Sequence, residues 1–361
     1  MKTWDVIVAG AGIIGASLAL ELRERGASVL VLDSGMPGRE ASFAAAGMLA
    51  PADPETPPAL RDLAFASAQM YPEFVRKLEE ASGSKVDFRR RGTIKFFETA
   101  SAPLFYRRLS DEELHALEPG ISRMPAAYTP FFVAEDTVDP RLLTQAVLAA
   151  AERKGAVVQG NTEVTGMQRH NDFVEVFAGE KRHITRAAVN CQGAWAGVPV
   201  RPRKGQMLSF LPENVLPGNK DLLRHVIVAS DVYLVPRSSG RILAGATVED
   251  VGYDKTTDVR AIHKLHQEAA RLVPELGNLP VAEQWAGLRP GTPDDLPLLG
   301  ETSERGIFIA AGHFRNGILL APVTARIMAN LIMGAPAGMN IKAFSPERFC
   351  AAQVVALPDK T

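Results

Sequence analysis

Two glycine-rich stretches, far apart in the chain, contain the residues that could carry out chemistry. Near the start, Gly10, Gly12 and Gly15 have the spacing of a turn that cradles the pyrophosphate of a dinucleotide. Near the end, Arg289 and Arg315 lie in glycine-rich surroundings. A planar guanidinium can hold a small carboxylate through two parallel hydrogen bonds. Together the two stretches predict redox chemistry on an amino acid.

The glycine turn has the sequence context that such a turn needs. It follows an apolar run at residues 4–9, opens a helical pattern, and precedes Asp33 at the end of the next apolar run. Gly10 permits the tight turn, Gly12 lets the main chain approach the phosphates, and Gly15 allows close packing of helix on strand. The helix N-terminus offers free N–H groups to the pyrophosphate, and Asp33 can accept hydrogen bonds from ribose hydroxyls. This turn alone would serve FAD or NAD equally.

The elements that position these residues follow from apolar spacing and from start and stop signals. Strands at 4–9 and 29–32 flank a helix, which makes a βαβ unit in the first 33 residues and predicts a doubly wound sheet. At residue 139 an Asp precedes Pro140, the pattern of a capped helix start, and Gly155 ends that helix. The remaining predicted helices cover residues 60–80, 110–118, 258–273 and 317–333, and the remaining strands 93–97, 156–159, 173–178, 183–190, 230–236, 241–246 and 307–311.

The alternation of these patterns predicts an α/β protein with two interleaved parts. A discontinuous nucleotide-binding domain takes residues 1–75, 140–202 and 284–345, and a substrate domain built on an antiparallel sheet takes 76–139 and 203–283. The strands at 230–236 and 241–246 are expected to pair antiparallel within the substrate domain.

Composition excludes several classes of protein. The chain has 361 residues with a net charge of −1, 46% hydrophobic and 22% charged residues, which is ordinary for a globular protein. A nucleic-acid binder would show a basic excess. Two cysteines, Cys191 and Cys350, make neither a disulfide framework nor a metal site, and we expect Cys191 to be buried and inert.

Nothing in the sequence predicts secretion or a membrane span. Residues 1–3 lead directly into a strand, which is not the pattern of a signal peptide. The most apolar window, 317–333, is interrupted by Pro322, Arg326 and Asn330. We therefore expect a cytoplasmic protein.

Three further stretches carry a family resemblance. They are Ala-Ala-Ala-Gly-Met-Leu-Ala-Pro at 44–51, Ala-Gly-Leu-Arg-Pro-Gly-Thr-Pro-Asp at 286–294, and Ala-Gly-His-Phe-Arg-Asn-Gly-Ile-Leu-Leu-Ala-Pro at 311–322. With the glycine turn they closely resemble the FAD-dependent glycine oxidases, which serve thiazole synthesis for thiamine within the D-amino-acid oxidase superfamily. The resemblance implies a Rossmann-like FAD-binding domain of the glutathione-reductase type, non-covalent FAD, and O2 reduced to H2O2 as an imino acid forms.

The resemblance also implies roles for individual residues. Arg289 would clamp the substrate carboxylate, Tyr233 would add a hydroxyl to it, and Arg315 would touch the substrate as well. No protein acid or base is required, so His313 is expected to pack against the flavin ring rather than to act as a base. The residues expected to line the FAD are Gly10, Gly12, Ile13, Ile14, Gly15, Asp33, Ser34, Ala41, Ser42, Ala46, Gly47, Met48, Val164, His313, Phe314, Arg315, Asn316, Gly317, Ile318 and Leu319.

Two positions depart from the family pattern. Asp231 and Val248 stand where relatives often have His and Met, which suggests a substrate range shifted from glycine toward other small amines. The sequence leaves open a D-amino-acid or sarcosine-type oxidase, a quinone-linked dehydrogenase, and a flavoprotein subunit without catalysis. It also leaves open a homo-oligomer. Cys350 is poorly placed for covalent attachment of a flavin.

Overall fold

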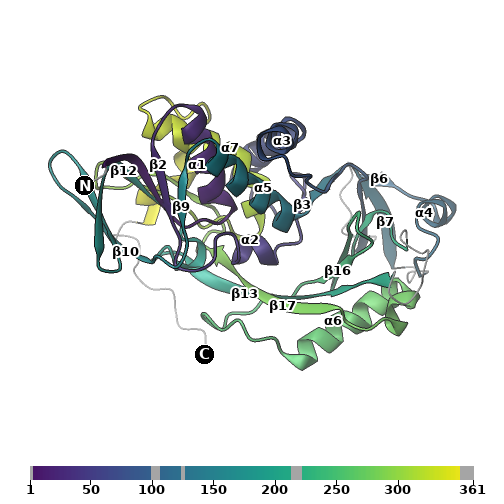
Figure 1. Ribbon diagram of the computed structural model, residues 1–361. Coiled ribbons are helices and arrows are strands. Elements are labelled where there is room, and N and C mark those ends of the chain that lie inside the picture. The colour runs from purple at the N-terminus through teal and green to yellow at the C-terminus, as the bar shows by residue number, and fades with distance from the viewer. Residues whose placement is uncertain (1–2, 99–105, 123–126, 213–221, 350–361) are drawn as a thin grey trace.

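The chain is built on two large sheets that lie at opposite ends of the molecule (Figure 1). A computed structural model describes residues 3–98, 106–122, 127–212 and 222–349. Cys350 lies outside the described residues. No described helix is long and apolar enough to cross a bilayer.

The first sheet has a parallel centre that ends at the glycine turn. β1 (Thr3–Ala9) pairs in parallel with β2 (Val29–Leu32) on one side and with β12 (Lys181–Asn190) on the other. The buried parts of these strands are continuous apolar runs: residues 6–9 of β1, all of β2, and residues 187–189 of β12. Parallel strands that are covered on both faces require such runs. The sheet is completed by β9 (Val157–Gln159), β10 (Val164–Arg169), β11 (Val174–Ala178), β18 (Leu298–Glu301) and β19 (Ile307–Ala311).

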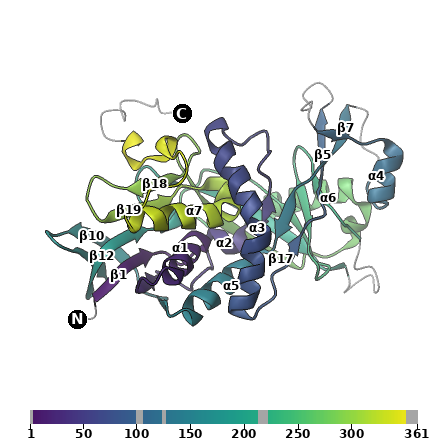
Figure 2. The same ribbon diagram turned by 90° about the horizontal axis from the view of Figure 1, so that it is seen from above.

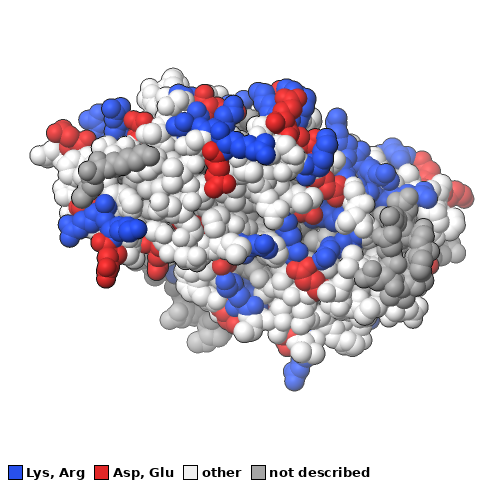
Figure 3. Space-filling view, in the orientation of Figure 1, with Lys and Arg blue, Asp and Glu red and all other residues white. Residues whose placement is uncertain are grey.

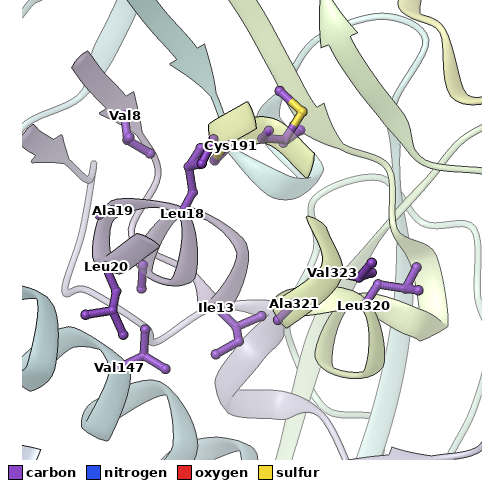
Figure 4. Close-up of a cluster of buried hydrophobic side chains, with 14 of the residues drawn as sticks. Val8, Ile13, Leu18, Ala19, Leu20, Val147, Cys191, Leu320, Ala321 and Val323 are labelled. Atoms are coloured by element: carbon purple, nitrogen blue, oxygen red, sulfur yellow. The ribbon is translucent and has the colours of Figure 1, made fainter. Parts of the chain in front are cut away.

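Helices cover one face of this sheet and make the largest core of the protein. α1 (Ile13–Glu24) contacts α5 (Pro140–Arg153) and α7 (Gly317–Ile332), and α3 (Arg61–Ser82) lies across both (Figures 1 and 2). Figure 4 shows Leu18 and Leu20 of α1 among side chains from α5, α7 and the sheet. This core holds the start of α1 in place beneath the glycine turn.

The second sheet is mainly antiparallel and forms the other end of the molecule. Its longest pairing joins β13 (Arg201–Phe210) to β17 (Glu283–Gly291) over nine residue pairs. α6 (Val259–Leu272) packs against one face of it, as Figure 1 shows, and α4 (Asp111–Leu117) lies at its far end. The other strands are β5 (Thr93–Glu98), β6 (Arg107–Arg108), β7 (Tyr128–Val133), β14 (Val226–Val228), β15 (Tyr233–Pro236) and β16 (Ile242–Gly245).

A small third sheet joins the two ends. β8 (Asp136–Val138) pairs with β3 (Met48–Leu49) and with β4 (Phe88–Arg89), close to α2 (Ala41–Ala44). The chain therefore passes between the two large sheets at residues 45–49, the stretch after α2.

The structure contains the predicted βαβ unit and the predicted antiparallel pair of β15 and β16. Asp139 caps α5 by accepting hydrogen bonds from Arg141 N and Leu142 N, as the Asp-Pro pattern indicates. The domain bounds remain a proposal, and two of them meet elements awkwardly. The bound at residue 75 falls inside α3, and the bound at 284 falls inside β17, which belongs to the antiparallel sheet.

Candidate functional site

At two positions of the glycine turn, Gly10 and Gly15, there is no room for a side chain. Gly10 has a φ of +101°, and a Cβ there would strike the carbonyl of Cys191, which directly follows strand β12. A Cβ on Gly15 would strike the Gly10 carbonyl oxygen. Close packing of α1 on the turn therefore depends on both glycines, which is the role that a dinucleotide-binding turn gives them.

The turn is also braced by side chains around the α1 N-terminus. Ser42 Oγ accepts a hydrogen bond from Ile13 N at 2.9 Å. Asp33 receives two main-chain hydrogen bonds, from Ala11 N at 2.7 Å and from Gly35 N at 2.9 Å. The first-turn N–H groups of an α-helix lack intrahelical acceptors, and the α1 N-cap residue provides no side-chain cap. A pyrophosphate would satisfy the first-turn donors that Ser42 leaves free, so the geometry fits a dinucleotide.

The stretch after α2 brings the main chain close to the same place. Gly47 has a φ of +75°, and a Cβ there would collide with the Val138 carbonyl oxygen of β8. Ala46 is buried and packs with Met48 of β3 and with Tyr233 and other apolar side chains of the second sheet. Small side chains at Ala41, Ser42 and Ala46 allow the main chain to pass close to a neighbouring group, as a bulky planar ring alongside it would require.

Arg289 and Tyr233 come together on the sheet face that looks toward this stretch. Arg289 lies across Gly205 of β13, where any Cβ would overlap the guanidinium, and donates to Thr247 O at 3.1 Å. The hydroxyl of Tyr233 lies over Gly245, 2.8 Å from the position of a Cβ there. Burial raises the pKa of Tyr233 and the neighbouring Arg289 offsets part of that rise, so the phenol stays neutral and can donate a hydrogen bond. These two side chains can bind one carboxylate together.

The structure places Arg315 differently. It pairs with Glu55 of the proline-rich loop and lies over the Phe314 ring at 5.3 Å. In the described part of the chain its guanidinium donates to the Glu55 carboxylate and not to the Tyr233 hydroxyl. A role in substrate binding would require Arg315 to exchange Glu55 for the substrate, and that role remains a proposal.

His313 is buried beside the start of α7 and cannot serve as an ordinary base. Its Nε2 lies 3.2 Å from Thr324 Oγ1, and its Nδ1 has no protein partner among the described residues. Burial lowers its pKa to about 3, so the ring is neutral at physiological pH. Ile318 and Leu319 are also buried there, while Asn316 and Gly317 are half-buried at the start of the helix.

Three other predicted cofactor contacts lie on the first sheet or directly beside it. Val164 begins β10; its side chain is buried in the sheet and its carbonyl accepts from Gln192 Nε2 at 3.0 Å. Ser34 is exposed beside the half-buried Asp33, and Ile14 is half-buried in the first turn of α1. The buried Cys191 has a pKa raised to about 12 by burial, in accord with an inert thiol.

The two unusual positions lie near the site but not within its buried part. Val248 is 51% exposed. Asp231 is exposed and lines a hollow of about 460 Å³ between α6 and the strand ends, together with Glu249, Asp258 and Glu268. Asp231 and Thr247, whose carbonyl accepts a hydrogen bond from Arg289, both line this hollow, and so does the positively charged Lys264.

Sequence reasoning missed several residues that shape this site. Met207, Trp285 and Arg237 all contact the residues around the stretch after α2. The sequence offered one signal for Arg237, its position directly after an apolar strand. A charged side chain there is either solvated or hydrogen-bonded to the main chain. Its burial, with 5% of its surface exposed, decides for the second.

A family model described as "FAD dependent oxidoreductase" (DAO) matches residues 5–331. The bifunctional protein ThiO/ThiG of Trichormus variabilis is 35% identical over 96% of this chain, which spans only 55% of that relative. The hydrogen cyanide synthase subunit HcnC of Pseudomonas aeruginosa is 32% identical over 96% of this chain and 97% of its own length.

Solved structures show the same arrangement. The crystal structure of glycine oxidase from Geobacillus kaustophilus matches with a TM-score of 0.88 and 30% identity, covering 96% of this chain and 98% of the other. The likeness therefore extends over both large sheets and the stretch between them, and not to the dinucleotide turn alone.

Proposed function

Because the chain belongs to the family of FAD-dependent oxidoreductases, we propose that it oxidises glycine or a similarly small amino acid to the imino acid, with O2 reduced to H2O2. The observation that carries this proposal is the position of Arg289 beside Tyr233, on the sheet face opposite Ala46 and Met48. A carboxylate held there would lie between the second sheet and the stretch that the family resemblance places against the flavin.

The residues of this chain would orient the substrate rather than exchange protons with it. FAD, when bound, would accept a hydride equivalent, which is two electrons and one proton, from the substrate Cα–H and would pass both electrons on to oxygen, while the amine N–H releases the second proton. Arg289 would fix the carboxylate in direction as well as in distance, since its guanidinium presents parallel N–H groups. Tyr233 would donate to the same carboxylate. The amine must reach the site unprotonated, and the low pKa of His313 removes that residue as a base.

Glycine oxidation that supplies thiazole synthesis is the biological role that we propose. The curated relatives named ThiO/ThiG support it, although this chain spans about half of their length. The relative named hydrogen cyanide synthase subunit supports a second candidate, in which the chain acts on glycine as part of a larger complex and cyanide is the product.

An oxygen electrode and a peroxide assay test the proposal directly. Purified protein is supplied with glycine, sarcosine, D-alanine or D-proline, and oxygen uptake, peroxide and cyanide are measured. Peroxide with one of these amino acids supports an oxidase. Reduction of the flavin without oxygen uptake indicates a dehydrogenase with another acceptor, and cyanide indicates the second candidate. A flavin that none of these amino acids reduces under anaerobic conditions contradicts the proposal.

The same screen, extended by a small amine that carries an additional positive group, tests the effect of Asp231 on specificity. If its charge favours amines that carry an additional positive group, Asp231→Asn should lower kcat/KM for such substrates and leave that for glycine unchanged. A strict preference for glycine in the wild-type protein would contradict the shifted substrate range. Denaturation of the yellow protein shows whether the flavin is released, as we propose for non-covalent FAD, and sedimentation gives the assembly.

A further inference from the structure

Carbonyl groups at the end of α2 and in the stretch after it accept hydrogen bonds from side chains that come from distant parts of the chain. Arg141 Nε donates to Phe43 O at 3.2 Å, and Trp285 Nε1 donates to Ala44 O at 3.1 Å. Main-chain carbonyls at such positions would otherwise be free to rotate with their peptide planes. Their fixation shows that this passage is braced before any ligand binds.

The shortest of these contacts comes from Arg237, which follows strand β15. Its Nη2 donates to Ala46 O at 2.6 Å and its Nη1 donates to Val138 O at 3.2 Å. Its Nε lies 3.7 Å from Asp139 Oδ2. Only 3% of the Arg237 side chain is exposed, and burial of a guanidinium is costly unless its donors are satisfied. Arg237 thus ties the end of β15, which also carries Tyr233, to the stretch after α2.

The hydrogen bond to Ala46 O decides the direction of a neighbouring donor. The Ala46–Gly47 peptide is trans, so its C=O and N–H point to opposite sides of the chain. With the carbonyl fixed on Arg237, the Gly47 N–H is fixed on the other side. Among the described residues no acceptor contacts that N–H, while the Gly47 carbonyl accepts from Val138 N at 2.9 Å. Buried N–H groups are rarely left without an acceptor, so a ligand acceptor is expected there.

We propose that Arg237 is a positioning residue for the flavin, which holds the Ala46–Gly47 peptide so that the Gly47 N–H donates to the isoalloxazine ring. The inference rests on the proposed function in one respect, namely that this stretch lines FAD. Arg237 touches neither substrate nor cofactor itself. A donor that is fixed beside the ring stabilises negative charge more than a mobile donor does. Loss of this fixed donor should therefore weaken binding of the reduced flavin more than binding of the oxidised flavin.

Variants Arg237→Lys and Arg237→Met test this with the full-length protein. FAD affinity is measured by flavin fluorescence, the two-electron midpoint potential by equilibration with a reference dye, and unfolding of the FAD-free protein by urea. We expect at least tenfold weaker binding of FAD. A further tenfold weaker binding of the reduced form corresponds to a potential lowered by about 30 mV. Arg237→Lys keeps the charge and one donor, so it should retain the fold even if Arg237→Met does not.

Arg89→Lys is the matched control. Arg89 Nη1 donates to Pro236 O at 2.6 Å, directly before Arg237 in the chain, and its Nη2 donates to Arg224 O at 3.1 Å. It should leave affinity and potential unchanged. An Arg237→Lys protein that binds FAD with the wild-type affinity and potential would overturn the inference. Wild-type protein that binds FAD but oxidises no amino acid would overturn the proposed function alone, and wild-type protein that binds no FAD would overturn both.

Discussion

At the scale of single residues, the Arg289 side chain packs against the main chain of β13. Its guanidinium crosses Gly205, the cross-strand partner of Gly287, and Gly287 in turn lets β17 approach Ala44 of α2. The two glycines therefore do different work at neighbouring positions. Gly205 leaves room for the charged group, and Gly287 brings the strand close to the proposed flavin site.

Replacement of Arg289 by Ala should weaken substrate binding strongly. The loss of a charge-assisted bidentate interaction is expected to cost about 2–4 kcal/mol, which raises KM for the best amino acid by about 30- to 1000-fold. Steady-state kinetics at saturating oxygen measure this, with the exposed Arg271→Ala of α6 as the control.

Gly205→Ala tests the same site from its other side. A Cβ at this position displaces the guanidinium, so KM should rise although Arg289 is retained. If KM is unaltered in both Arg289→Ala and Gly205→Ala, the carboxylate binds elsewhere.

His313 should make the protein less stable in acid. Burial lowers its pKa from an ordinary value of 6.5 to about 3 in the folded protein. Between these pH values the unfolded chain binds a proton that the folded protein does not, so the free energy of unfolding falls as pH falls, by up to about 1.4 kcal/mol per pH unit. His313→Gln removes this contribution.

Urea unfolding of wild-type and His313→Gln protein at pH 6.5, 5.5 and 4.5 measures the difference. The variant should gain stability relative to wild type as the pH is lowered. A difference that does not change with pH would mean that His313 titrates normally in the folded protein.

At the scale of elements, helix α7 contains a proline whose missing donor is replaced from a neighbouring helix. Pro322 lies four residues after Ile318 and has no N–H to donate to the Ile318 carbonyl. The hydroxyl of Tyr71 in α3 donates to that carbonyl instead, and Ser67 Oγ donates to Leu319 O at 2.6 Å. α3 therefore stabilises the start of α7, where His313 and the following residues are positioned.

Tyr71→Phe should lower the free energy of unfolding by about 1–3 kcal/mol, because it leaves a buried carbonyl without a donor. Pro322→Ala restores an N–H at the right place, so the double variant should recover part of this loss. Urea denaturation of both single variants and the double variant measures the coupling.

Tyr106→Phe is the control, since the Tyr106 hydroxyl donates to Ala52 O at 2.6 Å, outside α7. Pro322→Ala should not rescue it. Strictly additive effects of Tyr71→Phe and Pro322→Ala would show that the hydroxyl does not replace the missing donor.

At the scale of the whole molecule, positive and negative side chains are nearly balanced in number, with 40 Lys and Arg against 41 Asp and Glu. Figure 3 shows Lys and Arg interspersed with Asp and Glu over the visible face, in line with a net charge of −1. The residues of the proposed flavin and substrate sites come from the first 48 residues, from Val164 at the start of β10, from β15 to β17, and from residues 313–319 at and before the start of α7. Binding of FAD between these parts should therefore stabilise both ends together.

FAD removal should lower stability by an amount that mass action sets. At a free FAD concentration one hundred times Kd, the folded protein gains about 2.7 kcal/mol relative to the FAD-free protein. Thermal or urea unfolding of the FAD-free protein, with and without added FAD, measures it. NAD at the same concentration serves as the control, and an equal shift with NAD would contradict selectivity for FAD.

The sequence alone determined the features that depend on near neighbours. The βαβ unit, the glycine turn and the Asp139 cap span about 30 positions or fewer, and their apolar spacing and small residues leave few alternatives. Tertiary structure decided where long side chains reach. Arg237 contacts Ala46, Tyr71 contacts Ile318 and Arg315 contacts Glu55, each across some two hundred residues or more. No local pattern encodes such contacts, because they exist only once the two sheets are packed around the stretch after α2.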